Sequence, residues 1–238
     1  MIEFLRGWPH NHCPLHRCAT LPSVAHLPPA FGNISLAFYF HDMNFIAGNI
    51  YHIYNRGNNK QQIFFKDDNY IYFIEKIRKY ISPHCDILAY VLMPNHFHLL
   101  IHANEQTEMH VANAPIKRNV LSEGIRLLLS SYTKGINKQE NMTGNLIQQT
   151  TKSKCVYDAS LTIAGYATTC FYYIHDNPVR AGLTSKPQDW DFSSSPDYAE
   201  LRNGTLCNKT LAKALIDTKL DQAKYTSVVN KDTLKNIW

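Results

Sequence analysis

A chain of 238 residues with 45% hydrophobic residues is long and apolar enough to bury the core of one large domain. It contains no apolar run near the roughly 20 residues that a membrane-spanning helix needs, so we expect no membrane partner. The net charge of +5 permits an anionic partner, and six scattered cysteines favour free thiols in a reducing cytoplasm over a disulfide framework.

Residues 1–42 differ in composition from the rest of the chain. They contain five of the 11 prolines and only four charged residues, with neither helical nor strand periodicity. Histidines and cysteines between residues 10 and 18 are zinc-binding types, but no second ligand pair follows at the spacing of a zinc module. We therefore interpret residues 1–42 as a poorly ordered extension upstream of a natural start at Met43.

Regular patterns begin after Met43. Alternation of side-chain types over residues 49–57, which end in a glycine, predicts the first strand. Apolar residues at helical spacing predict a helix over residues 67–81, with Asp67 as its N-cap and Pro83 beyond its end.

Residues 85–102 form a predicted β-hairpin, in which a Pro-Asn turn joins two apolar strands. Successive side chains of a strand point to opposite faces, so His96, His98 and His102 share one face. Two imidazoles one residue apart can reach a single cation, although a His-x-His pair alone fits a half-exposed sheet face equally well. We interpret His102, further along the strand, as a residue that supports the ligands or faces the substrate.

Two further helices are predicted over residues 121–137 and 158–177. The second should end at Asn177, because Pro178 disfavours helical geometry in the residue before it. Since residues four apart lie on the same side of a helix, Tyr173 and Asn177 should project together.

The order strand, helix, strand, strand, helix predicts an α+β fold. We expect an antiparallel sheet with helices packed on one face, as in ferredoxin-like and RRM-like folds. The chain then divides into the extension of residues 1–42, a domain of residues 43–198, and a helical tail of residues 199–238 with a helix near residues 209–224.

Positive charge is concentrated between residues 116 and 154. Seven lysines and arginines fall there against two glutamates. Because nucleic-acid binding depends on neutralising phosphates, we place a phosphate backbone here. The candidate DNA-binding residues are Lys117, Arg118, Arg126, Lys134 and Lys152.

Several motifs occur in an ordered set along the chain. VLMPNHFH lies at residues 91–98 and YIHDNPVRAGL at 173–183; YHIYNRG lies at 51–57, SSYTKGIN at 130–137 and DWDFSSSPDY at 189–198. Together they resemble the single-tyrosine HUH transposases, and within them the branch of REP-associated tyrosine transposases. The resemblance covers most of the chain from about residue 50 to residue 198.

The resemblance implies a metal-dependent endonuclease and strand transferase that cuts single-stranded DNA at hairpins or palindromes through a 5′-phosphotyrosine intermediate. It implies Tyr173 as the nucleophile, and His96, His98 and Asn177 as ligands of Mg²⁺ or Mn²⁺. The neighbouring Tyr172 competes for the nucleophile's role but falls about 100° further round the helix. Such an enzyme would work in the bacterial cytoplasm, associated with the nucleoid. Because relatives include monomers and dimers, a homodimer with a shared site stays open.

One departure from the family pattern supports an alternative. Relatives often carry an arginine where this chain has Thr150. The chain could therefore be a catalytically decayed or repurposed single-stranded nucleic-acid-binding module of the same fold. In that case Tyr51, Tyr54 and Phe64 would be the surfaces on which bases stack.

Overall fold

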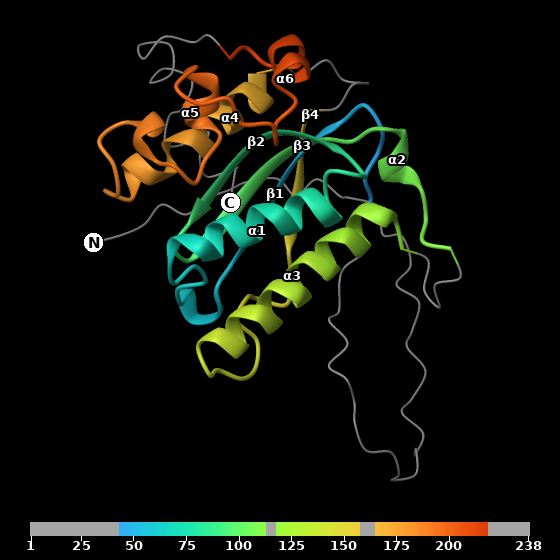
Figure 1. Cartoon of the computed structure of the whole chain (residues 1–238). Helices are drawn as coiled ribbons and strands as arrows, with labels where there is room; N and C mark the ends of the chain where they lie inside the picture. The colour runs from blue at the N-terminus through green and yellow to red at the C-terminus, as the bar shows by residue number, and fades with distance from the viewer. Residues whose placement is uncertain (1–42, 113–117, 158–164, 219–238) are drawn as a thin grey trace, which may run out of the picture. The chain divides into compact units, whose positions relative to one another are not determined.

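The computed structural model describes residues 43–112, 118–157 and 165–218 of the chain (Figure 1). The predicted extension of residues 1–42 and the last 20 residues, 219–238, therefore lie outside the described residues. None of the helices in the described ranges is long and apolar enough to cross a membrane.

A four-stranded antiparallel sheet forms the centre of the fold, with the strand order β2-β3-β1-β4. This is the order of the ferredoxin-like fold, so the predicted fold class is confirmed. The first three strands match the predicted segments, whereas the fourth was not predicted because only one of its residues is buried. The strands are β1 (Ile50–Arg56), β2 (Asp86–Met93), β3 (His96–His102) and β4 (Lys152–Tyr157).

Helices α1 (Asp67–Tyr80) and α3 (Val120–Gln139) cover one face of the sheet (Figure 1). Their apolar sides enclose a core in which the Phe73 ring lies 5.0 Å from the Phe97 ring, measured between centroids. The predicted N-cap of α1 is wrong by one residue, because Lys66 holds that position. The helix starts there because the Asn69 side chain accepts a hydrogen bond from the Lys66 N–H at 3.2 Å.

Helix α4 (Gly165–Arg180) lies over the opposite face of the sheet, so helices cover both faces and not one face as predicted (Figure 1). Its predicted end at Asn177 is wrong, since Pro178 lies inside the helix. A proline removes only its own N–H from the hydrogen-bond ladder, and here the last turn is closed by the next donors along the chain. The Ala181 N–H donates to the Asn177 carbonyl at 3.0 Å, and the Leu183 N–H donates to the Pro178 carbonyl at 2.9 Å.

The short elements are η1 (Asn58–Lys60), α2 (Glu105–Glu108), η2 (Pro187–Asp189), α5 (Ser195–Tyr198) and α6 (Lys209–Leu215). Helix α6 is shorter than the predicted tail helix, because its C-cap, Ile216, adopts an extended conformation.

The segment before α5 runs along the outer edge of β2. The Leu92 N–H donates to the Phe192 carbonyl at 2.9 Å, and the Ser194 N–H donates to the Tyr90 carbonyl at 3.0 Å. These bonds satisfy backbone groups that an uncovered edge strand would expose. The C-terminal part of the chain therefore completes the sheet.

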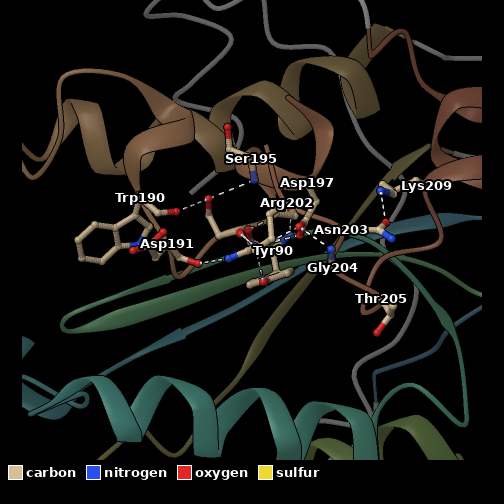
Figure 2. A network of polar contacts seen from close by, with 12 residues as sticks. Tyr90, Trp190, Asp191, Ser195, Asp197, Arg202, Asn203, Gly204, Thr205 and Lys209 are labelled. Atoms are coloured by element: carbon tan, nitrogen blue, oxygen red, sulfur yellow. Dashed lines mark hydrogen bonds and ion pairs between the residues drawn. The ribbon is translucent and has the colours of Figure 1, made fainter. Parts of the chain in front are cut away.

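Arg202 fastens this segment to the sheet (Figure 2). Its guanidinium donates two hydrogen bonds to the Asp197 carboxylate, at 2.8 and 2.9 Å. It also donates to the carbonyl oxygens of Asp191 and Ser193, both at 2.6 Å, and to the Tyr90 hydroxyl at 3.3 Å. Paired bonds from one guanidinium to a carboxylate are among the strongest polar contacts in proteins.

Candidate active site

The two histidines of the His-x-His pair lie side by side on β3. Their ring centroids are 5.0 Å apart, and both side chains are on the face of the sheet that α4 covers. His98 is buried, with 1% of its surface exposed, and His96 is half-buried. The alternation of strand side chains thus places both imidazoles as the sequence predicts.

Helix α4 brings Tyr173 and Asn177 to the same place. The Tyr173 ring meets the His98 ring edge-on, with centroids 5.8 Å apart. The Asn177 side chain lies close enough to those of His96 and Tyr173 to affect the pKa of each, and its Nδ2 donates to the Tyr173 carbonyl at 2.8 Å. One chain therefore brings together the four residues that the resemblance marks as catalytic or metal-binding.

Burial keeps both imidazoles neutral. It lowers the pKa of His96 to about 4. The neighbouring Asn177 side chain opposes this shift, and the positive charge of Arg56 adds to it. Burial also lowers the pKa of His98 well below its usual value, and the neighbouring His52 and His96 add to this. A metal ion binds the neutral form of imidazole, which is the form that both side chains have at neutral pH.

The donor set fits a divalent ion. Hard cations such as Mg²⁺ and Mn²⁺ prefer oxygen ligands, which the Asn177 amide can supply, while imidazole nitrogen suits transition metals. No group of three or more His, Cys, Asp or Glu residues that could hold an ion occurs in the described ranges, so a site here would use the amide as well.

A third histidine, His52 in β1, joins the pair. Its Nε2 lies 2.8 Å from His98 Nδ1, and its side chain has no exposed surface. Burial, and secondarily the charge of Lys154, lowers the pKa of His52 to about 3. The alternation of β1 indicated which face His52 occupies, but its contact with His98 depends on the pairing of β1 with β3, which the sequence did not reveal.

A cavity of about 210 Å³ opens beside His96 and His98. Lys152, one of the predicted DNA-binding residues, lines it, with its ammonium 5.9 Å from the centre of the Tyr54 ring. Arg56 adds a second positive charge that the sequence analysis did not single out. The remaining lining residues are Tyr54, Asn55, Gln148 and Thr150.

No known protein-family model matches the chain, and no curated protein matches it in sequence. Among solved structures, it is similar to a REP-associated tyrosine transposase bound to a REP hairpin. The sequence identity is 17% and the TM-score is 0.48, over 66% of this chain and 83% of that chain. We therefore infer function from the residues of the site and not from this likeness.

The other predicted DNA-binding residues are not gathered at the cavity beside His96. Arg118 and Arg126 both form ion pairs with Glu123, at 2.6 and 2.5 Å, and Lys134 is exposed on α3. Helix α3 packs on the opposite face of the sheet, and Lys117 lies outside the described residues. Of the predicted cations, the structure thus places only Lys152 beside the histidine pair, within the described part of the chain.

Two of the three proposed stacking residues are in the wrong place for that role. Tyr51 and Phe64 are buried in the core on the α1 and α3 side of the sheet, so only Tyr54 is at the cavity. His102 lies at the far end of β3 from His96, where its Nδ1 is 3.7 Å from the Asp86 carboxylate.

Helix α4 is anchored beside the site by its buried His175. Its Nε2 lies 2.7 Å from the Ser194 hydroxyl oxygen, and that hydroxyl also accepts a hydrogen bond from the Tyr90 N–H at 2.9 Å. The edge segment of β2 therefore holds the helix that carries Tyr173 and Asn177.

Proposed function

We propose that this chain is a metal-dependent endonuclease and strand transferase that acts on single-stranded DNA at hairpins, with Tyr173 as its nucleophile. One observation carries the proposal: within one chain, α4 lays Tyr173 and Asn177 against the paired imidazoles of His96 and His98. The sequence motifs that resemble single-tyrosine HUH transposases supply the same residues.

In the proposed step the Tyr173 oxygen attacks a backbone phosphorus. The bond between the tyrosine oxygen and phosphorus forms as the bond to the 3′ oxygen breaks, the phenolic proton leaves, and the 3′ oxygen gains a proton. The DNA phosphate remains esterified, so the strand can later be joined to another 3′ hydroxyl without a separate energy source. Covalent catalysis of this kind divides one difficult exchange into two easier steps.

The surroundings of Tyr173 control the reactivity of its phenol. Its side chain has 3% of its surface exposed, and burial raises its pKa; the hydrogen bond from Asn177 and the charge of Arg180 oppose that rise. An unassisted phenol, with a pKa of about 10, is a weak nucleophile at neutral pH. Burial outweighs these two effects, so Asn177 limits the rise in the pKa of the phenol but does not reverse it.

The approach of DNA is proposed to run through the cavity beside His98. His98 lines this cavity and also contacts the Tyr173 ring. A phosphate in the cavity would therefore be separated from the nucleophile by the His98 side chain alone. Arg56 and Lys152 would neutralise the neighbouring phosphates.

A divalent ion held by the imidazoles of His96 and His98 and the amide oxygen of Asn177 would polarise a phosphate oxygen and stabilise the developing charge. A second copy of the chain is not needed to complete this set, because one chain supplies all of its members.

The test is a covalent-adduct assay with Mn²⁺ and labelled single-stranded oligonucleotides that carry hairpins from the DNA flanking the gene. The wild-type protein should form an adduct that survives denaturing electrophoresis, Tyr173→Phe should abolish it, and His96→Ala should reduce it. Tyr172→Phe is the matched control and should leave the adduct intact.

Two outcomes would contradict the proposal. An adduct formed by Tyr173→Phe means that another residue is the nucleophile. Tight binding of hairpin DNA with no adduct from the wild-type protein supports the non-catalytic binding module instead, a reading that the burial of Tyr173 also favours.

A further inference from the structure

The structure gives His52 a contact that its position in the sequence does not explain. Its Nε2 is 2.8 Å from Nδ1 of His98, and the two rings lie edge to edge, with centroids 5.0 Å apart and an angle of 18° between their planes. The Tyr54 ring lies next to both of them, with its centroid 4.8 Å from that of His52 and 5.7 Å from that of His98. His52 has no exposed surface, so its orientation is set by this packing.

The contact restricts how His98 can bind a cation. A nitrogen that takes part in the hydrogen bond to His52 cannot also hold a metal ion, so Nε2 is the nitrogen of His98 that remains for one. A metal-bound nitrogen must offer a lone pair, and a neutral imidazole carries its single hydrogen on the other nitrogen. His98 would then carry its hydrogen on Nδ1 and donate it.

The acceptor for that hydrogen is His52. Two imidazolium rings would both present donors and repel each other, so a separation of 2.8 Å requires that one of the two nitrogens accept. Ligand histidines usually donate their second nitrogen to a carboxylate, a carbonyl or water, and this partner orients the ring and raises its basicity. Here a buried imidazole occupies that place.

We infer that His52 is a positioning residue, which accepts a hydrogen bond from His98 Nδ1 and thereby holds His98 Nε2 toward the metal ion. The inference rests on the proposed function, because it assumes that His98 is a ligand. It adds a third histidine, from a different strand, to the residues that the site requires.

The experiment measures the affinity of the purified protein for Mn²⁺, from the electron paramagnetic resonance signal of the free ion. His52→Leu removes the acceptor and should weaken Mn²⁺ binding roughly 10- to 100-fold, the usual effect of losing such a partner. His52→Gln should recover much of the affinity, because its side-chain carbonyl can accept the hydrogen bond. Ile53→Val, a change at the next buried residue of β1 on the opposite face, should leave the affinity unchanged.

Nitrogen-15 NMR of the wild-type protein with Mg²⁺ gives a second measurement, independent of activity. The His98 ring should carry its hydrogen on Nδ1, and a hydrogen on Nε2 would overturn the inference. Should His52→Leu fail to fold, His52→Asn takes its place, because its shorter side chain cannot reach His98.

The failure of this inference differs from that of the proposed function. If His98→Ala abolishes Mn²⁺ binding while His52→Leu binds as tightly as the wild type, His52 has no positioning role and the metal site stands. If the wild-type protein binds no Mn²⁺, or His98→Ala binds it normally, both the metal site and the role of His52 are wrong.

Discussion

Replacing Arg202 with alanine should destabilise the protein markedly, because this residue joins the segment around α5 to the sheet. The Asp197 carboxylate has 4% of its side-chain surface exposed, and Arg202 is the partner that makes two hydrogen bonds to it. Burial alone would raise the pKa of Asp197, but the bonds from Arg202 and from the Gly204 N–H outweigh burial and lower it. Arg202→Ala would remove two of the hydrogen bonds to this buried carboxylate and leave the bond from the Gly204 N–H.

The expected cost follows from this geometry. Breaking a fully buried ion pair costs about 3–5 kcal/mol. Because the Arg202 side chain is 36% exposed, we expect the lower part of that range or slightly less, about 2–3 kcal/mol. In a chain of this length each 1 kcal/mol lowers the melting temperature by about 2–4 °C, so the midpoint should fall by roughly 4–12 °C.

The assay is urea unfolding followed by circular dichroism, with Arg180→Ala as the control. Arg180 forms an exposed ion pair with Asp176 at 2.6 Å, four residues away on α4, and exposed pairs of this kind contribute about 0.5 kcal/mol or less. Asp197→Ala and the double variant complete a cycle in which the double loss should be smaller than the sum of the single losses. If Arg202→Ala unfolds within about 0.5 kcal/mol of the wild type, the Arg202 network does not hold the edge segment to β2.

Three further predictions concern other parts of the molecule. Burial lowers the pKa of His175 to about 3, so between pH 6.5 and 3 the unfolded chain takes up a proton that the folded chain does not. Stability should therefore fall as the pH drops through this window, by roughly 1 kcal/mol per pH unit for this group, and urea unfolding at several pH values should show a shallower slope in His175→Gln. Lys152→Ala should weaken binding of a single-stranded hairpin oligonucleotide and reduce the slope of log affinity against log salt by about 1. Lys134→Ala, on the opposite face of the sheet, should change neither. Fluorescence anisotropy at several salt concentrations measures both quantities, and the reverse pattern would show that DNA binds the opposite face. Gly124→Ala should destabilise the protein, because the added Cβ would lie 2.1 Å from the Tyr80 carbonyl oxygen of α1. This clash should outweigh the helix propensity of alanine, which exceeds that of glycine by about 1 kcal/mol. A melting temperature equal to or above that of the wild type would show that α1 and α3 do not pack so closely.

The sequence alone determined those features that depend on spacing along the chain. A period of two placed His96 and His98 on one face of β3, and a separation of four placed Tyr173 and Asn177 on one side of α4. The first three strands and the helices α1 and α3 followed from the same periodicities. Strand β4 escaped detection because it lies at the edge of the sheet and buries a single residue, so that its sequence carries little hydrophobic pattern.

Only the tertiary structure decided which of these features meet. The contact of His52 with His98 depends on the register between β1 and β3. This register pairs residues that are about 45 positions apart in the sequence. The approach of Tyr173 to His98 depends on α4 packing its apolar side against the sheet face that Ile50 and Leu100 line. Local periodicity specifies the faces of each element, but complementary packing between distant elements specifies which faces come together.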